Sequence, residues 1–526
     1  MSRFFNTAGP CDPRFHYMVP PEERLPEVRR LLDRMGYVVV HAPRQTGKTT
    51  ILRTLAKALT AEGRFAALHF SCEQAKVAED DYGAAEQIVL AALRLSAADA
   101  LPEDLCPPPW PESAAPGTLL RAALRAWTRA CPRPLVLFFD EIDALRGQSL
   151  ISVLSQLRAG YPDRPDSFPW SVVLCGLRDV RDYKLASGGE APRIGSSSPF
   201  NIKIRSLRVG DFDLDEIRML LAQHTADTGQ PFAEAAIERI GEVTAGQPWL
   251  VNALANEVTA EMGVEPPAPI TVEHVDHARE RLILARQTHL DSLAARLAEP
   301  RVRRVLEPIL TGALASADPY DDDFQYVADL GLIARDLPIR IANPIYQEVI
   351  PRVLAVTYER SVTAAPRSFV LPDGRLDFER LLNEFAAFWL QHGDVLTQRM
   401  NYHEVAPQLV LMAFLQRVVN GGGHIHREYG IGRGRIDLLV RWPWTDARGE
   451  RSEQLEALEL KVWSTGRPDP LDEGLRQLDG YLDRLALATG VLVIFDRRAD
   501  AAPIHERTRL GRATTPAGRD VTLFRA

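Results

Sequence analysis

Tyr37-Val-Val-Val-His-Ala-Pro-Arg-Gln-Thr-Gly-Lys-Thr-Thr50 is the stretch of this sequence with the strongest structural signal. Its short apolar run ends in a Pro-Arg-Gln-Thr-Gly turn, and the amphipathic Ile51-Leu-Arg-Thr-Leu-Ala-Lys-Ala-Leu59 follows directly. This order predicts a strand, a tight loop and a helix. In such a loop the backbone N–H groups and the helix N-terminus face the β- and γ-phosphates of a nucleotide.

The side chains of the loop predict a site for a nucleotide and its metal ion. Lys48 supplies a mobile cation, and Thr49 Oγ reaches the Mg²⁺. Ala42 stands where G-x-x-x-x-G-K-[ST] has its first glycine, a mild departure if the backbone there avoids a positive φ. The expected nucleotide contacts in this loop are Pro43, Arg44, Gln45, Thr46, Gly47, Lys48, Thr49 and Thr50.

A second apolar run, Pro134-Leu-Val-Leu-Phe-Phe-Asp-Glu-Ile-Asp143, ends in adjacent carboxylates. A strand this apolar is buried on both faces, as in a parallel sheet, and open α/β sheets bind ligands at the C-terminal ends of their strands. We therefore expect Asp140 to hold Mg²⁺ through water and Glu141 to polarise the attacking water.

Three further strands complete a doubly wound core. Arg178 lies just past one of them and is placed to contact the γ-phosphate, although a surface ion pair with Asp179 or Asp182 explains it equally well. These strands are expected over residues 64–70, 171–176 and 200–205.

Length, composition and charge limit the classes of protein. With 526 residues and 46% hydrophobic content, three or four globular domains are expected. The N-terminus has no hydrophobic signal core and no apolar run reaches eighteen residues, so we expect a soluble, cytoplasmic protein without a membrane part. The five cysteines form no C-x-x-C pair, which argues against zinc and disulfides.

The charge pattern argues against nucleic-acid binding through bulk positive charge. The formal net charge is −8, and from residue 366 onward 22 basic residues balance 22 acidic ones. Any such binding must come from local patches. Only six of the 62 basic residues are lysine, and two of them, Lys48 and Lys461, lie in the motifs argued here for chemistry.

The flanks of the core carry weaker patterns. Residues 1–35 predict a loop and a helix, in which Phe15, His16 and Tyr17 pack either in the core, the favoured interpretation, or against adenine. From Asp211 the chain turns helical, and residues 330–350 have the outline of a winged helix.

Residues from about 6 to 360 resemble a P-loop ATPase of the AAA+/STAND kind, near its archaeal-ATPase-like branch. Ala42–Thr49 matches Walker A apart from the first glycine, and Leu135–Glu141 matches Walker B. Arg178 occupies the place of the STAND arginine, and Gly246-Gln-Pro248 resembles the lid G-x-P, which implies that Pro248 contacts the nucleotide. The resemblance implies ATP with Mg²⁺. The chain shows no clear arginine finger, which favours a switch over a ring motor, and no repeat array that would sense a trigger.

A second constellation follows the linker. Residues 424–440 predict a strand, a glycine turn and a strand that starts with Asp437. In the strand 455–462, Glu459 and Lys461 share one face. If this strand pairs beside Asp437, two carboxylates and an amine converge. That set suits a hard divalent ion with a water beside the lysine, which is the equipment for phosphodiester cleavage.

This spacing resembles the PD-(D/E)xK nuclease superfamily over about residues 376–500. Gln477 and Tyr481 lie one helical turn apart, as in that family's Q-x-x-x-Y, while the first motif is Ile-Asp rather than Pro-Asp. The resemblance implies Asp437 and Glu459 as metal ligands, Lys461 as the catalytic lysine, Gln477 as its support and Glu404 as a further carboxylate.

We therefore predict an α/β protein, a doubly wound parallel P-loop core with helical lid and winged helix, followed by an α/β PD-(D/E)xK-like domain. The expected segments are 1–35 (lead), 36–210 (ATPase core), 211–262 (lid), 263–360 (winged helix), 361–373 (linker) and 374–526 (nuclease-like domain).

The predicted function is an ATP-binding and hydrolysing switch that controls a Mg²⁺- or Mn²⁺-dependent nuclease, in defence against phage or mobile elements. Expected partners are nucleic acid, DNA before RNA, a second copy of the chain, and an activating partner or phage component. Two alternatives stand beside it: an ATP-driven DNA-processing or repair enzyme, and a non-catalytic, ATP-gated protein that binds nucleic acid or a partner.

Overall fold

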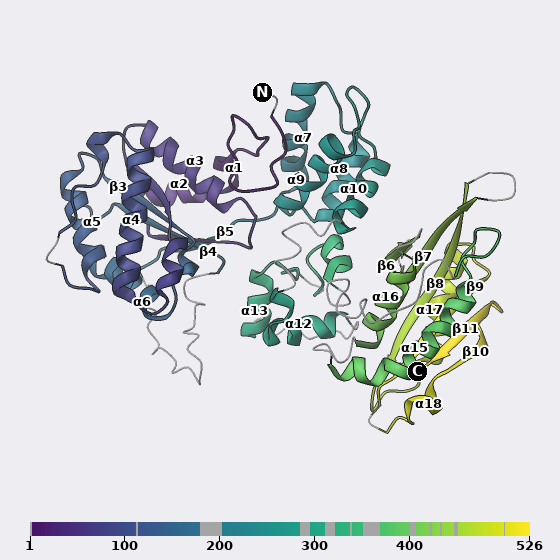
Figure 1. Cartoon of the computed structure of the whole chain (residues 1–526). Coiled ribbons are helices and arrows are strands. Elements are labelled where there is room, and N and C mark those ends of the chain that lie inside the picture. Colours follow the sequence, from purple (N-terminus) through teal and green to yellow (C-terminus); the bar gives the residue numbers. More distant parts are fainter. Residues whose placement is uncertain are drawn as a thin grey trace. The chain divides into compact units, whose positions relative to one another are not determined.

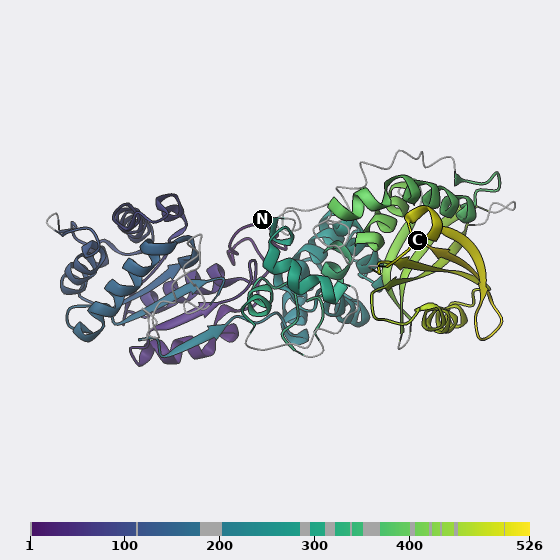
Figure 2. The same cartoon turned by 90° about the horizontal axis from the view of Figure 1, so that it is seen from below.

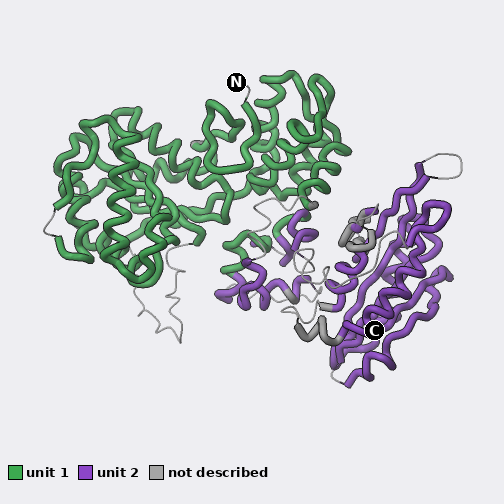
Figure 3. Tube along the Cα trace, viewed as in Figure 1, with its two compact units in different colours: residues 1–284, 325–334, 342–344 green, residues 285–324, 335–341, 345–526 purple. Residues whose placement is uncertain are grey.

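The chain folds into two compact units in the computed structural model (Figure 3). Unit 1 comprises Met1–Leu284, Gln325–Ala334 and Ala342–Pro344, and unit 2 comprises the remaining residues. The residues that the structure describes are 3–111, 114–178, 202–284, 295–310, 321–336, 339–350, 369–399, 406–419, 423–431, 434–445, 451–498 and 500–526.

A five-stranded parallel sheet forms the centre of unit 1. Strand β1 pairs with β4 on one side and with β5 on the other, and β3 lies between β2 and β4. Every residue of β3 and β4 is buried, as their apolar sequences require. In spatial order the strands are β2 (Ala66–Ser71), β3 (Leu135–Asp140), β4 (Ser171–Gly176), β1 (Val38–His41) and β5 (Arg205–Arg208).

Helices cover both faces of this sheet (Figure 1). One face packs against α4 (Tyr82–Ala100), α5 (Leu119–Ala130) and α6 (Gly147–Gly160). The other packs against α2 (Pro26–Asp33) and α3 (Lys48–Ala61). The predicted α/β class with a parallel P-loop core is therefore confirmed.

The fifth strand corrects the sequence prediction. It was expected over residues 200–205, but β5 spans Arg205–Arg208, and Ile204 before it is 54% exposed. The apolar alternation of residues 200–204 suggested a strand. An edge strand pairs with one neighbour only, so Arg-Ser-Leu-Arg can form β5 without an apolar run.

Four α-helices follow the sheet within the described residues 202–284. Asp213 and Glu216 form a capping box at the start of α7, and Pro248 opens α9 at a position where its missing N–H costs nothing. The helices are α7 (Leu214–Thr228), α8 (Glu234–Thr244), α9 (Pro248–Asn256) and α10 (Val272–Leu284).

The predicted winged-helix region is described only in part. It includes α12 (Pro300–Leu310) and α13 (Asp322–Asp329), and the Ala342 N–H donates to the Leu332 carbonyl over 3.0 Å before a helix over residues 344–350. Residues 285–294, 311–320, 337–338 and 351–368, which include most of the predicted linker, lie outside the described residues.

Unit 2 is built on a six-stranded mixed sheet between two layers of helices (Figure 2). α17 (Leu471–Arg484) packs on one face. α15 (Phe378–Arg399) and α16 (Ala406–Val419) lie on the other, where Phe385 and Trp389 contact Phe524 and Phe495. The order is β10 (Arg509–Thr514), β11 (Asp520–Arg525), β9 (Thr489–Asp496), β8 (Arg451–Trp463), β7 (Gly434–Thr445) and β6 (His424–Ile431).

Two strand limits in unit 2 differ from prediction. β7 begins at Gly434, so Asp437 lies inside the strand instead of starting it, and β8 extends the expected 455–462 at both ends. Both strands are longer because they pair with each other as far as Thr445 and Arg451, beside the hairpin tip. Within the described stretches, no helix has the length and apolar character needed to cross a membrane.

Candidate functional site

The predicted phosphate loop joins the end of β1 to the start of α3. Its left-handed residues are Gln45 (φ 60°) and Gly47 (φ 85°), while Ala42 keeps an ordinary φ. Thr46 Oγ1 donates to the Pro43 carbonyl over 3.0 Å and tightens the turn. Alanine fits in place of the first glycine because the unusual backbone angles occur later in the loop.

Lys48 is folded back over this loop. Its Nζ donates to the carbonyls of Ala42 and Pro43 over 2.8 and 2.7 Å. Burial lowers the pKa of the ammonium, although Asp140 and Asp143 oppose that effect. An anion that entered the loop would compete with these carbonyls for Lys48.

Asp140 is held by residues from three elements. Thr49 Oγ1 donates to Asp140 Oδ2 over 2.7 Å, and His69 Nε2 from β2 lies 3.0 Å from the same oxygen. Burial raises the pKa of Asp140, but the hydrogen bonds from His69 and Thr49 outweigh it and the net pKa is lowered. A hydroxyl and an ionised carboxylate side by side are oxygen ligands that Mg²⁺ accepts, so these residues fit the ion that accompanies ATP.

Glu141 occupies a strained backbone position directly after β3. Its φ and ψ are 54° and 41°, in the left-handed region that a non-glycine residue rarely adopts. Ser71 Oγ donates to Glu141 Oε2 over 2.5 Å, and burial raises the pKa of the carboxyl. A raised pKa suits a carboxylate that orients and accepts a proton from water.

Arg178 is buried, with 8% of its surface exposed, and pairs with a residue that sequence reasoning did not consider. Its Nε donates to Asp329 Oδ2 of α13 over 2.8 Å. The weighed alternatives, Asp179 and Asp182, lie outside the described residues. Nearby, a Cβ added at Gly331 would come within 2.9 Å of Pro43 Cβ. The segment Gln325–Ala334 therefore packs against both Arg178 and the phosphate loop.

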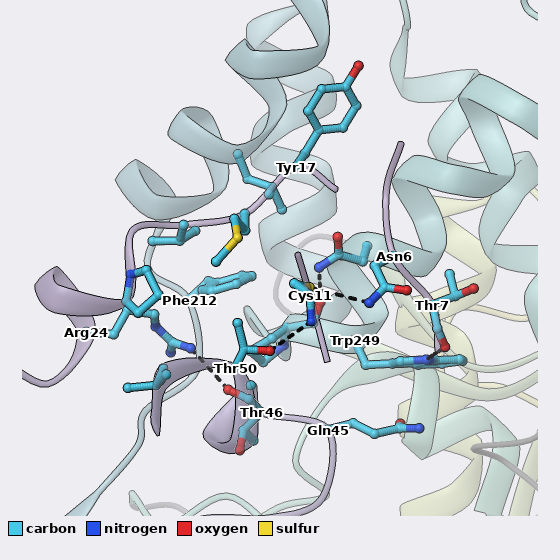
Figure 4. Close-up of a pocket in the computed structure, with 18 of the residues that line it drawn as sticks. Asn6, Thr7, Cys11, Tyr17, Arg24, Gln45, Thr46, Thr50, Phe212 and Trp249 are labelled. Carbon is cyan, nitrogen blue, oxygen red and sulfur yellow. Dashed lines mark hydrogen bonds between the residues drawn. The ribbon is translucent and has the colours of Figure 1, made fainter. Parts of the chain in front are cut away.

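A pocket of about 690 Å³, counting its part open to solvent, lies beside the phosphate loop (Figure 4). Gln45, Thr46, Gly47 and Thr50 line it from the loop and α3, and Pro248 lines it from α9.

The N-terminal segment Arg3–Val19 supplies another wall of this pocket. The Cys11 N–H donates to Thr50 Oγ1 over 3.0 Å, and Trp249 Nε1 donates to the Thr7 carbonyl over 2.8 Å. Of the aromatic residues weighed from the sequence, Tyr17 is buried and also lines the pocket, whereas Phe15 is 41% exposed. Pocket residues that the sequence reasoning missed include Asn6, Thr7, Cys11, Arg24, Phe212 and Trp249.

The second predicted constellation comes together on the face of β7 and β8 that packs against α17. Leu438 pairs with Leu458, which sets Asp437 beside Glu459. Asp437 Oδ2 accepts a hydrogen bond from the Leu460 N–H over 2.7 Å.

Lys461 connects this carboxylate pair to α17. Its Nζ lies 2.8 Å from Glu459 Oε1 and also donates to Gln477 Oε1. Gln477 in turn donates to Glu473 Oε1 over 3.2 Å. Sequence reasoning missed Glu473, although its place one turn before Gln477 was a usable signal.

Glu459 is the least satisfied of these groups. It is 2% exposed, and its Oε2 is buried without a hydrogen-bond partner. Burial, with a further contribution from the charge of Asp437, raises the pKa of Glu459 to about 8, against the opposing effect of Lys461. Burial also lowers the pKa of Lys461, but the charge of Glu459 outweighs it, and the net pKa is raised.

An orphaned carboxylate oxygen beside a second carboxylate fits a divalent cation, which would compensate both charges. Among the described residues, however, no group of three or more His, Cys, Asp or Glu side chains is placed to hold a metal ion. Glu404, the further predicted ligand, lies outside the described residues.

Comparisons with known proteins bear on the first site. Residues 22–165 match the family model described as "AAA ATPase domain", and no curated protein matches the chain. The structure is similar to a Walker-type ATPase of Pyrococcus abyssi (16% identity, TM-score 0.45, 66% of this chain and 99% of that one). It is also similar to the RuvB Holliday junction branch migration motor of Thermotoga maritima (17%, 0.35, 63% and 95%) and to Cdc6p of Pyrobaculum aerophilum (16%, 0.35, 64% and 95%).

The family match covers the strand, loop and helix that surround Lys48 and the strand that ends in Asp140. Residues 22–165 therefore form a P-loop ATPase domain of the AAA type, a class that uses ATP with Mg²⁺.

Proposed function

We propose that this protein is an ATP-controlled, metal-dependent nuclease, in which the nucleotide state of unit 1 governs phosphodiester cleavage by unit 2. One observation carries the proposal. Asp437, Glu459, Lys461 and Gln477 meet on one face of the sheet, and Glu459 keeps a buried oxygen without a partner. Buried carboxylates are commonly paired with cations or coordinate metals, and a metal ion here would stabilise the ionised form of Glu459.

Each residue has a chemical role in this proposal. Asp437 and Glu459 would hold Mg²⁺ or Mn²⁺, which supplies charge stabilisation for the phosphodiester, and Glu404 would add a third carboxylate. Lys461 would orient a water beside the metal ion, because its ammonium is fixed between Glu459 and Gln477. Gln477 would keep Lys461 in that position.

The contact between Arg178 and Asp329 supports nucleotide control. If Arg178 contacts the γ-phosphate of ATP, the phosphate and Asp329 compete for one guanidinium. ATP would then favour a state in which Arg178 has left α13, and ADP, without a γ-phosphate, would not. This competition is the physical basis for a switch of the STAND kind.

We also propose a substrate, partners, a location and a biological role for this protein. DNA is the proposed substrate, a second copy of the chain and an activating partner or phage component are proposed to complete the active state, and the cytoplasm is the proposed location. Defence against phage or mobile elements is proposed from the combination of domains.

A second candidate is an ATP-gated protein whose unit 2 binds nucleic acid or a partner without cutting. It is favoured by the lack, within the described residues, of a third metal-binding side chain beside Asp437 and Glu459. The two candidates differ in whether Glu459 and Lys461 are needed for a reaction.

Cleavage of plasmid, linear DNA and RNA tests the proposal, with Mg²⁺ or Mn²⁺ and with or without ATP. Lys461→Ala and Glu459→Gln should abolish cleavage and leave ATP hydrolysis within about twofold. The exposed Arg467→Ala is the matched control. Loss of cleavage in Lys48→Ala would add nucleotide control, whereas nucleic-acid binding without cleavage by any variant would favour the second candidate.

A further inference from the structure

Arg24 is a buried cation beside the phosphate loop that belongs to none of the motifs discussed so far. It ends the short helix α1 (Pro21–Arg24), and only 6% of its side chain is exposed. It lines the pocket together with Thr46 and Gly47 (Figure 4).

Each of the three guanidinium nitrogens donates a hydrogen bond. Nη1 donates to the Thr46 carbonyl over 3.1 Å, Nη2 donates to the Gly210 carbonyl, and Nε donates to Glu216 Oε1 over 3.1 Å. The group also lies 4.6 Å from the centre of the Phe212 ring. Burying a charge is costly unless the group is paired and hydrogen-bonded, so these three hydrogen bonds fix the position of Arg24 closely.

The contact with Thr46 has a consequence for the next residue. The Thr46 carbonyl and the Gly47 N–H belong to one planar trans peptide group, so they point in opposite directions. Holding the carbonyl therefore directs the Gly47 N–H away from Arg24. Gly47 has a φ of 85° and, as a glycine, turns easily, so its peptide group needs an external restraint.

The other two contacts connect this restraint to the lid. Gly210 lies in the connection between β5 and α7, and Glu216 lies in the first turn of α7. Glu216 also accepts a hydrogen bond from the Asp213 N–H over 2.9 Å as part of the capping box of α7. One side chain thus joins the phosphate loop to the first helix of the lid.

We propose that Arg24 is a positioning residue for phosphate binding: it holds the Thr46–Gly47 peptide with its N–H available to the β-phosphate, and it ties that orientation to α7. The ligands concerned are nucleoside di- and triphosphates, because the backbone N–H groups of a P-loop bind the β- and γ-phosphates. The inference rests on the AAA ATPase assignment and is independent of any nuclease activity.

The test compares ADP with AMP, which lacks the β-phosphate, in the full-length protein. In Arg24→Met the ratio of ADP to AMP affinity should fall about tenfold, the size expected for loss of a hydrogen bond from a charged donor. Calorimetry gives both constants. Arg29→Met, which removes an exposed arginine paired with Glu62, should leave the ratio within about twofold.

Two further variants separate positioning from packing. Arg24→Lys retains a cation with a single donor nitrogen, so it should restore part of the ratio. Glu216→Gln keeps the Thr46 contact and should change the ratio less than Arg24→Met does. The KM for ATP should rise about tenfold in Arg24→Met, with kcat changed less than about threefold.

An unchanged ratio in Arg24→Met would overturn the inference. If Arg24→Met does not fold, the same ratio in Arg24→Lys decides, because a purely packing role predicts equal losses for ADP and AMP. Failure of the wild type to bind either nucleotide would instead count against the ATPase assignment.

Discussion

The two candidate sites differ in how far their polar groups are already satisfied. In the ATPase site, Lys48 binds loop carbonyls, Glu141 accepts from Ser71, and Arg178 pairs with Asp329. In the site on the sheet of unit 2, Glu459 retains a buried oxygen without a partner. A ligand at the first site must exchange existing bonds, which makes binding a conformational event. At the second site a cation would relieve a standing electrostatic cost.

Among the variants that test whether ligands exchange existing bonds at the ATPase site, Lys48→Ala should have the largest effect. Because Lys48 is the loop cation that can leave its carbonyls for a phosphate, we expect ATP hydrolysis to fall about a hundredfold or more. Steady-state hydrolysis measures this, with the exposed Lys57→Ala as control. Hydrolysis retained within about threefold would mean that Lys48 does not leave the loop carbonyls for a phosphate.

The pH dependence of metal binding tests whether a cation binds at the buried oxygen of Glu459 in unit 2. Glu459, with a pKa of about 8, must lose its proton before it can hold a cation. The affinity for Mn²⁺ at this site should therefore rise about tenfold per pH unit from pH 6 towards 8 and then level off. The difference between wild type and Glu459→Gln isolates the site. A difference that does not vary with pH would contradict the raised pKa.

The raised pKa of Glu459 also predicts how the free energy of unfolding depends on pH in the absence of metal. Its folded pKa is raised above the unfolded value of about 4.3, so its stabilising contribution is present at low pH and is lost as pH rises towards 8, by up to about 1.4 kcal/mol per pH unit. Denaturant unfolding should show a steeper decline between pH 5 and 8 in wild type than in Glu459→Gln. Parallel profiles would show that Glu459 titrates normally.

Releasing Arg178 should have a smaller effect. If the bond to Asp329 competes with the γ-phosphate, Asp329→Asn should raise ATP hydrolysis about fivefold by weakening the competitor. Asp336→Asn, which removes an exposed partner of Arg340, is the matched control. A fall in hydrolysis would mean that the pair belongs to the active arrangement.

The smallest effect is expected at Ala42. Its ordinary φ means that Ala42→Gly, which restores the usual motif, should change the KM for ATP by less than about twofold. A large gain in affinity would show that the loop adopts a different backbone when nucleotide is bound.

The central parts of the fold were predictable and the edges were not. β4 has the predicted bounds, and β3 lies within the predicted run, because strands buried on both faces need continuous apolar sequence. β5 could not be placed this way, since among the described strands it pairs with β1 alone. The glycine-rich stretch before Asp437 predicted a turn, but β7 already begins at Gly434, so Asp437 lies within the strand.

The partners of the predicted residues were harder to foresee. Ser71 pairs with Asp140 across β2 and β3, which brings it to Glu141, and no local pattern specifies that register. Asp329 is 151 residues from Arg178 in sequence. Glu459, Lys461 and Gln477 were within reach because strand alternation and helical spacing are local rules. The roles assigned to them remain predictions.

The position of the N-terminal segment in the pocket wall determines when the pocket can be completed during synthesis. Thr7 and Cys11 are translated before the residues that they bind, which are Trp249 and Thr50 respectively, and Trp249 follows Thr7 by more than two hundred residues. The pocket wall that they form can close only when α9 has emerged. A nascent chain that already contains its phosphate loop therefore lacks a complete pocket until α9 has been translated, so this unit is expected to acquire nucleotide late in synthesis.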